Sequence, residues 1–156
     1  MLKKLLAMVA VLFLTACSSR MNGETTTICT NAPDAGVPAD VVVTIEGDDE
    51  DIRVWNERFT MTREQFNVHF LEGEHLIDDE ISELFDYLNM LEADGFELRL
   101  VALSDQEVVI EYVYDYAVIS SEALNELWEV DDFEGEITLS AAIRGLESQG
   151  AICRTD

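Results

Sequence analysis

The sequence predicts an α+β fold, with a mainly antiparallel sheet and helices packed on one face. Two segments, residues 41–61 and 96–116, are predicted to be β-hairpins, because each holds two strand-like runs joined by a polar turn. Residues 78–94 lie between them and residues 138–150 follow, and both place apolar side chains at the helical period. Hairpins separated by helix favour an antiparallel sheet over a parallel one.

The first strands of the predicted domain are rich in threonine and valine. Residues 26–31 predict a strand, and two prolines and a glycine in residues 32–38 mark the loop after it. The β-branched run 41–46 predicts the next strand. The acidic turn 47–51 then joins it to residues 52–61, which complete the hairpin.

Residues 62–94 carry the sequence signals of two helices. Thr62 and Gln65 have the spacing of a capping box and predict a short helix that Gly73 interrupts. Residues 78–94 begin with three acidic residues, which suit the positive end of a helix, and end before Gly95. The apolar residues of this longer helix are Ile81, Leu84, Phe85, Leu88 and Leu91.

The second hairpin contains the clearest strand, residues 108–116. One of its faces is predicted to be core and holds Val108, Ile110, Tyr112, Tyr114 and Tyr116. The alternative is that the three tyrosines form a binding platform for sugars or peptides.

The C-terminal part is predicted to be helical and to end in a strand. Ser120 or Ser121 is expected to cap a helix that contains Trp128, and an acidic connection over residues 130–136 follows. Thr138 or Ser140 is expected to cap a last helix, which Gly150 ends before a final strand at 151–153.

The N-terminus has the features of a lipoprotein signal. A basic start with Lys3 and Lys4 precedes a short apolar stretch, and Leu14-Thr15-Ala16-Cys17 then matches a lipobox. We therefore expect residues 1–16 to be removed and Cys17 to carry a lipid that anchors the protein to the cell membrane, facing away from the cytoplasm. An ordinary secretory signal with a chance cysteine is the alternative. Residues 17–25 are expected to be a tether, and residues 26–156 a single domain.

Cleavage leaves a very acidic chain without lysine. Seven arginines then face 33 acidic residues, a net charge of −26. Such a field repels nucleic acid and anionic lipid, and suits cations or basic partners. The alternative is that it serves only solubility. Cys29 and Cys153 remain once Cys17 is assigned to lipid, and outside the cytoplasm they are expected to form a disulfide. Two buried free thiols are the alternative.

Several segments together resemble the YehR-like family of small bacterial lipoproteins. They are the lipobox, the run Thr25-Thr26-Thr27-Ile28-Cys29, the strand 41–48 and the ending 137–153. The chain departs from this family in having no lysine after cleavage, and in having Gly47-Asp48-Asp49 where members often have Gly-Asp-Lys. The resemblance implies a lipoprotein and assigns no activity or functional residue.

No catalytic or cofactor motif stands out, so we expect a non-enzymatic module that binds an unknown protein or small ligand, without a cofactor or nucleic acid. The alternative is a cation-handling or metal-dependent protein that uses the region His69–Asp79, where His69 and His75 lie among carboxylates. Gly73 interrupts that region, and the HExxH spacing is missing, so no metal ligands are assigned. The acidic run 48–51 lacks the spacing of an EF-hand and is interpreted as a solvated turn.

Overall fold

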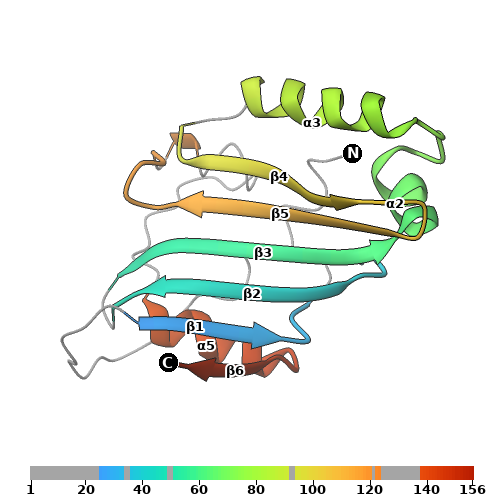
Figure 1. Cartoon of the computed structure of the whole chain (residues 1–156). Helices are drawn as coiled ribbons and strands as arrows, with labels where there is room; N and C mark the ends of the chain where they lie inside the picture. Colours follow the sequence, from blue (N-terminus) through green and yellow to red (C-terminus); the bar gives the residue numbers. More distant parts are fainter. Residues whose placement is uncertain (1–24, 34–35, 49–50, 92–93, 121, 124–137) are drawn as a thin grey trace.

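A computed structural model describes residues 25–33, 36–48, 51–91, 94–120, 122–123 and 138–156 (Figure 1). Its centre is a six-stranded, fully antiparallel sheet with the strand order β4-β5-β3-β2-β1-β6. The strands are β1 (Thr25–Thr30), β2 (Asp40–Gly47), β3 (Ile52–Thr62), β4 (Phe96–Leu103), β5 (Glu107–Asp115) and β6 (Ile152–Thr155). The structure therefore confirms the α+β fold with a mainly antiparallel sheet.

Three helices are described around this sheet. Figure 1 shows α2 (Arg63–Phe70) at one end of the sheet, α3 (Asp78–Leu91) along the edge strand β4, and α5 (Leu139–Ser148) behind β1 and β6. The predicted capping box at Thr62 is confirmed, since its hydroxyl accepts from the Gln65 amide while the Gln65 side chain accepts from the Thr62 amide. Thr138 caps α5. No helix in the described ranges is both long and apolar enough to cross a membrane.

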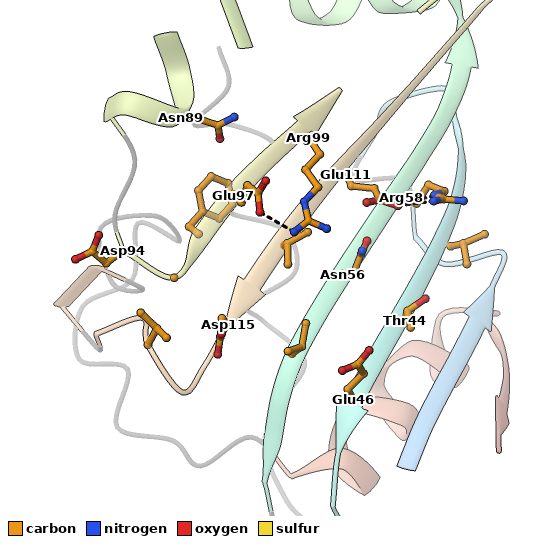
Figure 2. Close-up of a pocket in the computed structure, with 16 residues that line it drawn as sticks. Thr44, Glu46, Asn56, Arg58, Asn89, Asp94, Glu97, Arg99, Glu111 and Asp115 are labelled. Carbon is orange, nitrogen blue, oxygen red and sulfur yellow. Dashed lines mark hydrogen bonds and ion pairs between the residues drawn. The ribbon is translucent and has the colours of Figure 1, made fainter. Parts of the chain in front are cut away.

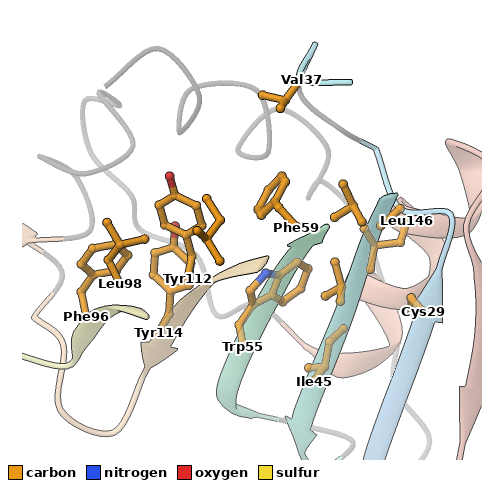
Figure 3. Close-up of a cluster of buried hydrophobic side chains, with 14 of the residues drawn as sticks. Cys29, Val37, Ile45, Trp55, Phe59, Phe96, Leu98, Tyr112, Tyr114 and Leu146 are labelled. Carbon is orange, nitrogen blue, oxygen red and sulfur yellow. The ribbon is translucent and has the colours of Figure 1, made fainter. Parts of the chain in front are cut away.

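One face of the sheet, here called the core face, is buried (Figure 3). Strand alternation brings side chains from five strands to it, and α5 adds Leu139, Ala142 and Leu146. Tyr112 and Tyr114 are buried here, at 3% and 4% exposure, so the predicted core role of these tyrosines is confirmed. Other members of this face are Cys29, Val43, Ile45, Trp55, Phe59, Phe96, Leu98, Val108 and Ile110.

Glu57 is an ionisable side chain on this largely apolar face. It lies between the Tyr112 and Val43 positions of the neighbouring strands, and its Oε1 accepts a 2.8 Å hydrogen bond from Nε1 of Trp55. Burial raises the pKa of Glu57 to about 7, although the Trp55 hydrogen bond lowers it. Burial and the nearby Glu57 charge also raise the pKa of Tyr116.

A disulfide joins Cys29 to Cys153 and confirms the predicted pairing. The two residues lie directly opposite each other in the β1–β6 pair, with their Cα atoms 4.0 Å apart. Beside the disulfide, the hydroxyl groups of Thr27 and Thr155 share a 2.8 Å hydrogen bond. The bond therefore fixes the C-terminal edge strand to the first strand.

Several of the sequence predictions lie outside the described residues. They are the signal peptide, Cys17, the tether up to residue 24, most of the helix expected after Ser120, and the acidic connection at 130–136. The predicted strand 108–116 corresponds to β5, which ends at Asp115, and Tyr116 lies in the turn that follows.

Candidate functional site

The second face of the sheet, here called the open face, forms a broad hollow of about 880 Å³ (Figure 2). Its floor is made by the alternate, outward-pointing residues of four neighbouring strands, β2, β3, β5 and β4. Of the described helices, only α3 contributes to the lining, through Asn89. Five carboxylates and two guanidinium groups line the hollow, so its formal charge is −3.

Charged side chains form a row across the β3, β5 and β4 strands. Arg58, Glu111 and Arg99 occupy directly opposed positions in the two strand pairs, so positive and negative charges alternate along the row. Nη2 and Nε of Arg58 lie 2.6 and 2.7 Å from Oε1 of Glu111. The Glu111 side chain is only 9% exposed, so this ion pair is partly shielded from water.

Arg99 has a second partner on its own strand. Its Nη2 lies 2.7 Å from Oε2 of Glu97, and this hydrogen bond lowers the pKa of Glu97 and raises that of Arg99. The four side chains Arg58, Glu111, Arg99 and Glu97 have no net charge. The charges at this end of the hollow are therefore balanced by one another.

The other end of the hollow has an excess of negative charge. Glu46, Asp94 and Asp115 lie there, near the ends of β2 and β5 and the start of β4 (Figure 2). Nη2 of Arg53 donates to Oε2 of Glu46 at 2.9 Å, in an ion pair whose side chains are 53% and 40% exposed. Oδ1 of Asp115 accepts from the Ala117 amide at 3.0 Å. Even with Arg53 included, this end keeps a formal charge of −2.

Between the two ends lies a band of small polar and aliphatic side chains. Thr44, Asn56 and Val113 are neighbours across β2, β3 and β5, and Val54 continues the band toward the acidic end. Val118, 57% exposed, stands at the rim. A surface with aliphatic contacts beside ionic groups can hold a ligand that is both charged and partly apolar.

Asn89 holds the edge of the hollow in shape. Its side-chain amide donates to the Leu98 carbonyl at 2.7 Å, and its carbonyl accepts from the Leu98 amide at 2.8 Å. These bonds satisfy outward-facing backbone groups of the edge strand β4, with which no further strand pairs in the described part of the chain. The helix α3 thereby fixes β4 and, with it, the positions of Glu97 and Arg99.

The structure does not gather the histidine region into a metal site. Nδ1 of His75 lies 3.0 Å from Nδ2 of Asn67, and His69 is in the last turn of α2. In the described part of the chain, no three His, Cys, Asp or Glu side chains come close enough together to hold a metal ion. The metal-dependent alternative for His69–Asp79 stays a prediction.

Sequence reasoning did not find the open face. A signal was present, because Asn56, Arg58 and Glu111 occupy the outward positions of two strands whose inward positions are mostly apolar. Their neighbourhood depends on β3 pairing with β5, a contact between residues 53 positions apart for Arg58 and Glu111.

Two solved structures share this fold. An NMR structure of a protein from Streptococcus pneumoniae superimposes with a TM-score of 0.58 at 16% identity, over 90% of this chain and 92% of that one. The NMR structure of Escherichia coli YehR also gives 0.58, at 11% identity, over 85% of this chain and 91% of YehR. Neither a protein-family model nor a curated protein matches the sequence. The similarity establishes a shared fold that includes YehR.

Proposed function

We propose that the mature chain is a lipoprotein of the YehR-like type, held outside the cytoplasm by a lipid on Cys17, and that the open face of its sheet binds a partner without catalysis. The lipobox supports the anchor, and the YehR fold supports the kinship. The observation that carries the binding role is the contrast between the two faces of one sheet. One is buried in the core, and the other is a hollow of about 880 Å³.

The lining of the hollow supports binding over catalysis. Cysteine, histidine, serine and lysine are absent from the described residues that line it, so its candidate nucleophiles and bases are Thr44 and the carboxylates. Two of its carboxylates, Glu97 and Glu111, are engaged by arginines. Side chains held in ion pairs are suited to present a fixed pattern of charge to a partner.

The anchor is tested by fractionation of cells grown with labelled palmitate. We expect the wild-type protein to take up label and to sediment with membranes, and Cys17→Ser to do neither. Soluble, unlabelled wild-type protein would contradict the anchor.

The binding face is tested separately, by cross-linking on intact cells. Asn56→Trp places a large side chain in the middle of the hollow, whereas Ser82→Trp places the same side chain on the exposed surface of α3. We expect the wild-type protein to form cross-linked complexes with its partner, Asn56→Trp to lose these complexes and Ser82→Trp to keep them. Equal cross-linking by both variants would remove the open face from the proposal.

A further inference from the structure

The open face has a built-in polarity. At one end Arg58, Glu111, Arg99 and Glu97 neutralise one another. At the other end Glu46, Asp94 and Asp115 leave an excess of negative charge that Arg53 only partly offsets. A partner that matches this face must therefore bring positive charge to the acidic end.

The positive group that fits is an organic cation. No three carboxylates of the described chain lie close enough together to share a metal ion, so the charges at this end are spread over a surface. Half-buried Val54 and Val113, with exposed Val118, line the same part of the hollow. Lysine and arginine side chains combine a long aliphatic stem with a charged end, and they cover such apolar surface while the charge reaches a carboxylate.

The breadth of the hollow fits a segment of several residues. Its floor crosses four strands, and three interstrand spacings span roughly 14 Å. About four residues of an extended chain cover this distance.

Charge also decides against other occupants. The chain carries a formal net charge of −24, so a second copy would bring more negative charge to a negative face. An anionic lipid surface is repelled in the same way.

We propose, on the basis of the binding role above, that the open face docks a basic segment of a partner protein. Lysine or arginine side chains of that segment lie over Val54, Val113 and Val118, with their charges beside Glu46, Asp94 and Asp115.

The test uses the full chain as cells produce it, purified in detergent, and a fluorescent hexapeptide of alternating lysine and valine. Its matched control is the same peptide with glutamate in place of lysine. We expect the lysine peptide alone to bind by fluorescence anisotropy, and to bind more weakly as salt is raised.

Two double variants test where on the surface the peptide binds. The double variant Glu46→Gln with Asp115→Asn removes two charges from the acidic end and keeps side-chain shape, and the side-chain carbonyl introduced by Asp115→Asn can still accept from the Ala117 amide. Loss of each exposed charge contact should weaken binding by about threefold, so the double variant should bind about tenfold more weakly. Asp79→Asn with Glu83→Gln removes the same charge from the exposed surface of α3 and should change affinity less than twofold. Melting temperatures confirm that both variants are folded.

The outcomes separate this inference from the proposed function. Equally weakened peptide binding in both double variants, or no binding of the lysine peptide, overturns the proposal that the open face docks a basic segment. If Asn56→Trp still abolishes cross-linking in that case, the open face remains a binding face for another occupant. A dimer by sedimentation that the Glu46/Asp115 variant loses, or binding to phosphatidylserine vesicles, also overturns it. Loss of peptide binding in the Glu46/Asp115 variant alone supports it.

Discussion

Glu57 should make the stability of the protein depend on pH. Its pKa is about 7 in the folded chain and 4.5 when it is exposed to water, because the folded core disfavours the charged form. The folded state therefore binds the proton more tightly, and stability falls as the pH rises from about 4.5 through 7. At about 1.4 kcal/mol for each tenfold change in proton affinity, the loss is about 3 kcal/mol and is complete above pH 7.

The substitution Glu57→Gln removes this loss, because the amide stays neutral while its carbonyl can still accept from Trp55. Urea unfolding followed by circular dichroism at pH 4, 6 and 8 measures the effect. Between pH 4 and pH 8 the wild type should lose about 3 kcal/mol more than the variant. Glu83→Gln, at an exposed position of α3, removes one charge without this burial and controls for general repulsion. Parallel curves for wild type and Glu57→Gln would falsify the reasoning.

The same ionisation can be followed in the folded protein. Trp55 donates its indole hydrogen to Glu57 at 2.8 Å, so its fluorescence should change as the carboxyl titrates. In a Trp128→Phe background, which leaves a single tryptophan, the midpoint should lie near pH 7. The transition should vanish in Glu57→Gln. A signal that persists there would assign the titration to another group.

Three further perturbations test other features. Reduction of Cys29–Cys153 opens a loop of 124 residues and should cost about 2–4 kcal/mol in urea unfolding, with roughly 5 as the chain-entropy bound, and no change on reduction would contradict this. Gly95→Ala brings a Cβ to 2.5 Å from the Ile119 amide nitrogen at φ +89°, whereas in Gly150→Ala, at φ +99°, the Cβ meets open space. Both variants should lose about 1–2 kcal/mol of stability through backbone strain, and Gly95→Ala should lose about 2 kcal/mol more through the close contact. Equal losses of stability in the two variants would exclude the close approach at Gly95. Melting temperature should rise with sodium chloride and gradually with millimolar calcium or zinc. A one-to-one zinc isotherm at micromolar concentration, lost in His69→Ala or His75→Ala, would instead favour the metal-dependent alternative.

Local patterns in the sequence predicted most elements of the fold. The alternation in residues 108–116 identified β5, the Thr62–Gln65 spacing identified the start of α2, and the acidic turn 47–51 separated β2 from β3. These signals succeed because each depends on neighbours within a few residues. The pairing of Cys29 with Cys153 followed from counting cysteines, while their opposed positions in neighbouring strands came only from the structure.

The open face was harder to predict because it depends on strand order. Arg58 and Arg99 become neighbours of Glu111 only when β5 lies between β3 and β4, and sheet order is set by contacts between distant segments. The inward position of Glu57 could be predicted, since it lies two residues from both Trp55 and Phe59 and so shares their face of the strand. Its raised pKa was not, because that depends on how completely the core covers it.

The disulfide between β1 and β6 has a mechanical consequence. A pull on the N-terminal side of the domain enters the sheet at Thr25 and reaches Cys29 within the same strand. From there the load divides between two covalent routes, onward along β1 and across to β6 and α5. Hydrogen bonds before Cys29 can be peeled away one by one, but the core-forming segments lie inside the closed covalent loop. If the chain is anchored through Cys17 as proposed, a pull on its N-terminal side should therefore strip the β1 hydrogen bonds that precede Cys29 before it strains the rest of the sheet.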